Sequence, residues 1–179
     1  MKKIIALGGS NSKNSINKLL ATYVANKVQN VTVSILDLND FELPIYGIDI
    51  EAENGIPENA KKLSDLIAST DGLVISLAEH NGSYTSSFKN TIDWLSRIDI
   101  KVWKDKPILL LATSPGARGG ATVLQSAKSY FPYLGGDVVA DFSLASFYEN
   151  FSENKISNHE LKEELLQKIR LFEQKITHI

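Results

Sequence analysis

The chain has no cysteine among its 179 residues and only three histidines. The lack of cysteine excludes disulfide bonds, thiolate metal sites and a cysteine nucleophile, and it is compatible with a reducing cytoplasm. His80 has no second histidine nearby, while His159 and His178 fall in a C-terminal helical region. We therefore expect a cytoplasmic protein without a metal site.

Strong charge of one sign and long apolar runs are also missing. The formal net charge is −2, from 19 basic and 21 acidic residues, and no basic run reaches five residues, so we expect no nucleic-acid partner. No stretch approaches the roughly 20 apolar residues of a membrane span, so we expect no membrane partner. Residues 1–7 imitate a signal peptide, but their apolar run ends at Gly8, short of an h-region of about 7–15 residues. They are better interpreted as a first strand.

The apolar and β-branched runs that the chain does contain alternate with segments of helical spacing. One domain over residues 1–179 accommodates this pattern. Strand, helix, strand in this alternation predicts a doubly wound α/β sandwich with a parallel sheet. Right-handed crossovers leave two strand orders open, 2-1-3-4-5 and a dinucleotide-binding order. The five expected strands are 3–7, 31–36, 71–76, 107–113 and 137–144.

Residues 37–58 carry seven acidic residues and no lysine or arginine, with prolines and glycines between them. We expect a long acidic surface loop. Loops of more than about 12–15 residues are often functional, so a solvated connection and a lid or subunit contact both stay open.

The aromatic residues predict further packing. Trp94 shares a helical segment with Phe88 and Leu95, and we expect all three to face the core. A second aromatic group is compatible with simple packing and with a dimer contact: Phe142, Phe147, Tyr148 and Phe151.

Three polar loops follow expected strands, at residues 8–17, 79–84 and 114–120. In an open α/β sheet, ligands bind at the carboxyl ends of the strands. The first loop offers hydroxyl and amide side chains with free N–H groups at a helix start, which suits a terminal phosphate monoester, although a simple helix cap is the alternative. It matches neither G-x-G-x-x-G nor the P-loop pattern.

The other two loops have competing interpretations as well. Asn81-Gly82 is a strong turn signal, so the second loop could be only a turn. Arg118 in the third loop could meet a dinucleotide phosphate or simply be an exposed arginine.

Taken in order, the loops resemble the NADPH-dependent FMN reductase family of flavodoxin-like proteins, over residues 3 to about 136. The family's first loop reads approximately Gly-Ser-x-Arg-x-x-Ser-x-Asn, and its second Pro-Glu-Tyr-Asn-x-Ser followed by Leu-Lys-Asn-x-x-Asp-Trp. Ser12 replaces the arginine, Ala78 the proline, His80 the tyrosine and Phe88 the leucine. The matching residues are Gly9, Ser10, Ser15, Asn17, Glu79, Asn81, Ser83, Lys89, Asn90, Asp93 and Trp94.

The resemblance implies a flavodoxin-like three-layer sandwich of order 2-1-3-4-5 that binds FMN. The FMN phosphate would sit in the first loop, and its ring would lie between residues 79–83 and 114–119. The flavin would carry the chemistry, so no catalytic side chain is expected. The resemblance implies these cofactor-binding residues: Ser10, Ser12, Ser15, Ile16, Asn17, Glu79, His80, Asn81, Ser83, Ser114, Gly116 and Gly119.

The implied activity is an FMN-dependent NAD(P)H oxidoreductase. It would transfer two electrons from NADPH or NADH to a quinone, a flavin or a similar small-molecule acceptor, by a ping-pong mechanism. A homodimer or higher homo-oligomer with the flavin near the interface is implied too. Two alternatives stay open: a flavodoxin-type electron carrier, and a binding module that kept the fold but lost flavin chemistry, as the departures at Ala78 and His80 would allow.

Overall fold

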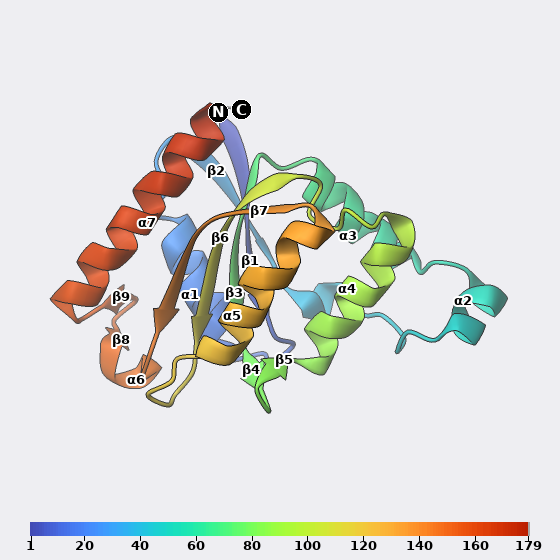
Figure 1. Cartoon of the computed structure of the whole chain (residues 1–179), viewed down its shortest axis with the longest axis horizontal. Helices are drawn as coiled ribbons and strands as arrows, with labels where there is room; N and C mark the ends of the chain where they lie inside the picture. Colours follow the sequence, from blue (N-terminus) through green and yellow to red (C-terminus); the bar gives the residue numbers. More distant parts are fainter. Residues whose placement is uncertain (179) are drawn as a thin grey trace.

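The computed structural model describes residues 1–178, so the last residue of the predicted domain, 179, lies outside the described residues. A parallel five-stranded sheet forms its centre, in the order β2-β1-β3-β6-β7 (Figure 1). This confirms the order 2-1-3-4-5. The strands are β1 (Lys2–Gly9), β2 (Val31–Leu36), β3 (Gly72–Leu77), β6 (Lys106–Thr113) and β7 (Gly136–Leu144).

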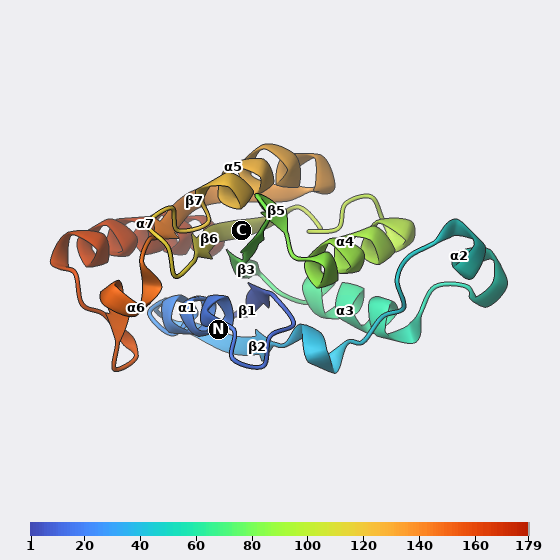
Figure 2. The same cartoon turned by 90° about the horizontal axis from the view of Figure 1, so that it is seen from below.

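The segments of helical spacing form helices that cover both faces of the sheet. The packed core clusters place α3, α4 and α5 on one face and α1 and α7 on the other. The three layers are visible end-on in Figure 2. The helices are α1 (Ile16–Ala25), α3 (Glu58–Ala68), α4 (Ser86–Ile98), α5 (Ala121–Tyr130) and α7 (His159–Thr177).

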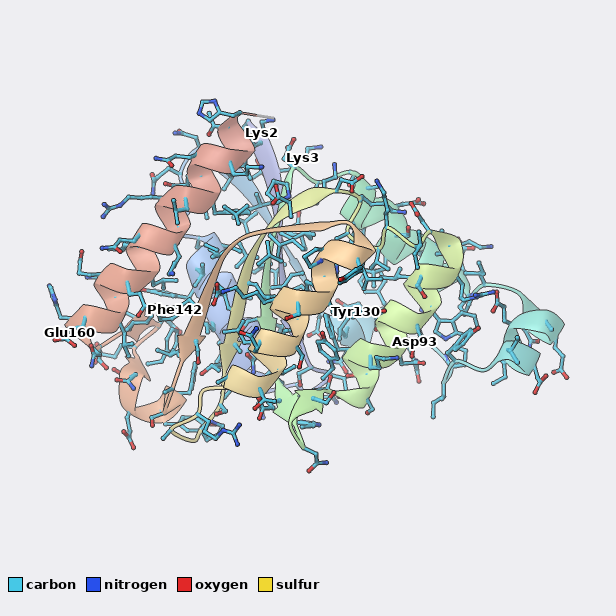
Figure 3. The ribbon with its side chains drawn as sticks, in the orientation of Figure 1. Lys2, Lys3, Asp93, Tyr130, Phe142 and Glu160 are labelled. Atoms are coloured by element: carbon cyan, nitrogen blue, oxygen red, sulfur yellow. The ribbon has the colours of Figure 1, made fainter. Side chains whose placement is uncertain are left out.

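Alternate side chains of each strand enter opposite halves of the core. Ile5 and Leu7 of β1 belong to the cluster under α3, α4 and α5, whereas Ile4 and Ala6 belong to the cluster under α1 and α7. Phe142 of β7, labelled in Figure 3, lies in the second cluster. Burial on both faces explains why the inner strands are continuous apolar runs without polar alternation.

Several short elements were not predicted. The acidic segment contains a 3-10 turn, η1 (Leu38–Asp40), and a helix, α2 (Ile48–Asn54), so it is not wholly a loop. Seven residues are too few to show helical periodicity, but the acidic first turn of α2 complements the helix dipole. The remaining short elements are η2 (Phe131–Leu134), α6 (Phe147–Asn150), the hairpin of β4 (Glu79–His80) with β5 (Ser83–Tyr84), and the hairpin of β8 (Phe151–Ser152) with β9 (Lys155–Ile156).

All five central strands point the same way, so their carboxyl ends meet at one edge. The β4–β5 hairpin, the loop after β6 and α6 gather there, at the lower edge of Figure 1, while the start of β1 and the end of α7 lie at the opposite edge. Within the described residues, no helix has the length and apolar character that crossing a membrane would require.

Candidate functional site

A cavity of about 210 Å³, which we call the cradle, opens at the carboxyl ends of β1, β3 and β6. At β1 the chain order reverses, because β2 lies on one side of it and β3 on the other. Such a switch point is where ligands bind in open α/β sheets. The walls of the cradle are Ser10, Ser12, Asn14, Ser15, Ile16, Asn17, Ala78, Glu79, His80, Thr113, Ser114, Pro115 and Tyr148.

The first loop presents hydrogen-bond donors to the cradle. Ser15 is the N-cap of α1, and its Oγ accepts the Lys18 N–H at 3.1 Å. Ser10 Oγ accepts the Ser12 N–H at 3.1 Å, which fixes the turn before the helix. The N–H groups of Ile16 and Asn17 belong to the first helical turn and have no intrahelical acceptor. Hydroxyls, free N–H groups and a helix N-terminus together fit a phosphate monoester.

The donors that the first loop presents to the cradle are neutral. Among the walls of the cradle, Glu79 and His80 are the only ionisable side chains apart from the phenol of Tyr148. Lys18 of α1 is ion-paired with Asp37 at the end of β2. Burial disfavours the charged form of Asp37, but hydrogen bonds from Lys18 and Asn39 outweigh it and hold the pKa of Asp37 below its usual value. The Lys18 ammonium is thus engaged outside the cradle.

The second loop is a hairpin fixed to α5. Asn81 and Gly82 have φ values of 51° and 75°, the two positive values that a two-residue type I′ hairpin turn needs. The turn signal is therefore confirmed. Glu79 Oε2 accepts the Val123 N–H of the first turn of α5 at 2.9 Å. This bond holds the β4–β5 hairpin in place. Ala78, just before the hairpin, and His80, within it, line the cradle.

The third loop is fixed to α6. The Phe147 N–H donates to the Ser114 carbonyl and the Ser146 N–H to the Gly116 carbonyl, both at 3.0 Å. These bonds bring α6 against the loop, so that Tyr148 reaches the rim of the cradle while staying 70% exposed. Pro115 and the ring of Tyr148 add apolar surface to the cradle, which a planar ring could contact.

The structure brings most predicted site residues into the cradle, but four lie outside its walls. Asn81 and Ser83 are exposed at the hairpin turn, and Gly116 and Gly119 lie farther along the third loop. Arg118 is also outside and donates to the Thr122 hydroxyl at 2.6 Å. Five walls were not predicted: Asn14, Ala78, Thr113, Pro115 and Tyr148.

The Lys-Asn-x-x-Asp-Trp motif has a role that its sequence did not indicate. Trp94 is fully buried, as predicted, but its indole N–H donates to the Pro44 carbonyl at 2.8 Å and its ring meets Tyr46 edge-on at 5.0 Å. Asn90 donates to the same carbonyl and accepts the Tyr46 N–H at 2.8 Å. Trp94 thus holds the acidic segment and is not part of the core formed by Phe88 and its neighbours.

The chain matches the NADPH-dependent FMN reductase family over residues 2–149. It is 32% identical over 136 residues to a quinone reductase of Escherichia coli (strain K12), covering 74% of this chain and 70% of the relative. A 2-hydroxy-1,4-benzoquinone reductase of Burkholderia sp is 34% identical over 134 residues, with 74% and 71% covered.

A solved structure with the same architecture is a flavoenzyme NAD(P)H:(acceptor) oxidoreductase from Paracoccus denitrificans. It superposes with a TM-score of 0.79 at 26% identity, covering 99% of this chain and 98% of that one. The switch-point cradle, the neutral donors of its first loop and the apolar surface of Pro115 agree with this similarity. The chain belongs to the NADPH-dependent FMN reductase family.

Proposed function

We propose that this FMN-dependent NAD(P)H oxidoreductase binds its FMN in the cradle and passes electrons to a quinone, a free flavin or a similar small acceptor. One observation carries the proposal: three serines of the first loop and the first turn of α1 line a cavity that Ala78 and Pro115 also line. The acceptor class is supported by relatives that are quinone and benzoquinone reductases. The cysteine-free composition is compatible with the cytoplasmic location that we also propose.

FMN supplies the redox chemistry when bound, and the chain supplies binding and orientation. Ser10, Ser12 and Ser15 would donate to the phosphate, together with the free N–H groups of α1. Ala78 and Pro115 would flank the ring. One carboxylate oxygen of Glu79 accepts a hydrogen bond from α5, so we propose that Glu79 holds the hairpin beside the ring.

The activity is tested by mixing the FMN-loaded protein anaerobically with excess NADPH, and separately with NADH. We expect the visible flavin absorbance to disappear within seconds with at least one nucleotide, and 1,4-benzoquinone to restore it. A flavodoxin-type carrier would respond slowly to both nucleotides. If dithionite alone bleaches the flavin, the oxidoreductase assignment is wrong for this chain and the carrier is favoured.

Replacing Ser10 and Ser15 together by alanine should weaken FMN binding at least tenfold. Hydrogen bonds to a charged acceptor contribute about 1.5–3 kcal/mol each, and about 1.4 kcal/mol corresponds to tenfold. Fluorescence titration of the apoprotein with FMN measures the change. Unchanged affinity would show that this loop does not bind the phosphate.

Ser15 also caps α1, so the loss of a ligand contact must be separated from the loss of a helix cap. Asn158 caps α7 in the same way, with its side chain accepting the Leu161 N–H at 3.1 Å, and it is not a wall of the cradle. Asn158→Ala should lose a similar cap energy, about 0.5–2 kcal/mol, without weakening FMN binding. Ser15→Thr keeps the hydroxyl and should bind FMN nearly normally.

We further propose that the protein is a homodimer and that the acidic segment contributes to its interface. In Figures 1 and 2, α2 projects away from the three layers. It buries none of its residues, and Ile45 and Ile48 are 82% and 71% exposed. Arg97 of α4 holds Glu51 of α2 at 2.9 Å, so the projection has a fixed position. Fixed, exposed apolar side chains favour an isologous contact with a second copy.

A further inference from the structure

We infer that Asn17 is a positioning residue: its buried carboxamide fixes the spacing of the three loops, and FMN affinity depends on it through that spacing. The inference rests on the FMN cradle proposed above. Asn17 is 2% exposed. Its Nδ2 donates to the Thr113 carbonyl at 3.1 Å, and its Oδ1 accepts the Thr113 N–H at 3.1 Å and the Ser76 hydroxyl at 2.7 Å.

The carboxamide of Asn17 takes the place of a strand partner. The pairing of β3 with β6 ends at Leu77 and Ala112, one residue before Thr113. Asn17 then pairs with both the N–H and the C=O of Thr113, as one residue of a hydrogen-bonded antiparallel pair does with the other. The side chain of Asn17, which comes from helix α1, therefore continues the hydrogen bonding of the sheet one residue past the end of the β3–β6 pairing.

Each partner of Asn17 leads to a different loop. Asn17 itself lies in the first turn of α1, Ser76 is two residues before Ala78, and Thr113 immediately precedes Ser114. Thr113 Oγ1 donates in turn to the Leu144 carbonyl at 2.6 Å, which joins the end of β7 to the same network. One carboxamide thus connects the phosphate side of the cradle with both sides that would enclose the ring.

The hydrogen-bond capacity of the side chain argues against a role mainly as a phosphate donor. Both acceptor positions of Oδ1 and one hydrogen of Nδ2 are used inside the protein, which leaves one N–H for any ligand. Ser76 and Thr113 are 0% and 1% exposed, so water cannot replace a deleted partner without rearrangement. Removing the carboxamide should therefore shift the loops.

Riboflavin, which lacks the phosphate, separates positioning from direct phosphate contact. Asn17→Ala should weaken FMN and riboflavin binding by a similar factor, roughly tenfold, because three buried groups lose their partner and all three loops relax. The variant with Ser10 and Ser15 both replaced by alanine should weaken FMN binding but not riboflavin binding. Asn26→Ala, at the other end of α1 and outside the cradle, is the matched control and should leave both affinities unchanged.

Asn17→Asp provides a second readout. An aspartate needs a proton to donate to the Thr113 carbonyl, and burial would raise its pKa, so the variant's defect relative to wild type should be smallest at low pH and grow as pH rises. We expect this growth with riboflavin as well as with FMN. A direct phosphate contact would give it with FMN only.

Hydrogen exchange of the apoproteins gives a readout that needs no flavin. Asn17→Ala should speed exchange in residues 10–17, 76–80 and 112–116, whereas Ser15→Ala should affect the first of these segments alone. The inference is overturned if Asn17→Ala weakens only FMN binding, or if faster exchange stays within residues 10–17. If wild type binds neither flavin, the proposed FMN cradle fails, and the exchange pattern still decides whether Asn17 couples the loops.

Discussion

Gly8→Ala is expected to destabilise the protein by about 1–3 kcal/mol and to weaken FMN binding roughly tenfold to a hundredfold. A Cβ at Gly8 would lie 2.6 Å from Lys18 N and 2.7 Å from Lys18 Cα. Both are backbone atoms, so the first turn of α1 has to move away from β1. That turn carries Ser15 and the free N–H groups proposed for the phosphate, because Lys18 N is the group that Ser15 caps.

The two effects of Gly8→Ala are measured by denaturant unfolding and by fluorescence titration with FMN. Gly47→Ala is the matched control: a Cβ there would meet only Ile50, at 3.8 Å, and Gly47 has an extended backbone that alanine tolerates. It should change neither stability nor affinity appreciably. If Gly8→Ala is as benign as Gly47→Ala, the close approach of β1 to α1 has no bearing on the site.

Much of the fold follows from the sequence alone because its inner strands are buried on both faces. Continuous apolar runs such as residues 108–112 indicate strands that are covered on both faces, and all five expected strands are present. The strand order did not follow from periodicity, since right-handed crossovers permit more than one. Only the resemblance of the loop motifs indicated 2-1-3-4-5, which the structure confirms.

The location of the candidate site was predictable from the sequence, but the role of each residue within it was not. Loops at the carboxyl ends of parallel strands must meet, so residues 8–17, 79–84 and 114–120 were expected at one edge. Which side chains face the cradle depends on long-range bonds. Glu79 reaches α5, and Asn17 reaches Thr113, 96 residues away in the chain. No local pattern encodes such pairs.

The acidic segment illustrates the same limit. Its composition indicated a surface connection, and no residue of α2 is buried. Its fixed position comes from α4, where Asn90, Trp94 and Arg97 lie at helical spacing and face Pro44, Tyr46 and Glu51. The sequence of α4 predicts an amphipathic helix, but not that part of its surface contacts a segment 44 to 50 residues earlier in the chain.

Trp94→Ala is expected to lower the free energy of unfolding by about 3–5 kcal/mol and to weaken the proposed dimer. The substitution removes a fully buried side chain and leaves the Pro44 carbonyl with Asn90 as its remaining partner. The acidic segment should then detach from α4. Chemical unfolding measures the first effect, and sedimentation velocity over a range of protein concentrations measures the second.

Trp103 provides a control that separates the hydrogen bond of Trp94 from simple packing. Trp103 is 1% exposed, and within residues 1–178 its indole N–H has no hydrogen-bond partner. Tryptophan to phenylalanine removes a similar volume at either position, but only Trp94→Phe deletes a bond, to Pro44, which contributes about 0.5–1.5 kcal/mol. Trp94→Phe should therefore shift the dimer equilibrium toward monomer, whereas Trp103→Phe should not. Equal dimerisation of the two variants would show that this hydrogen bond does not position the acidic segment for assembly.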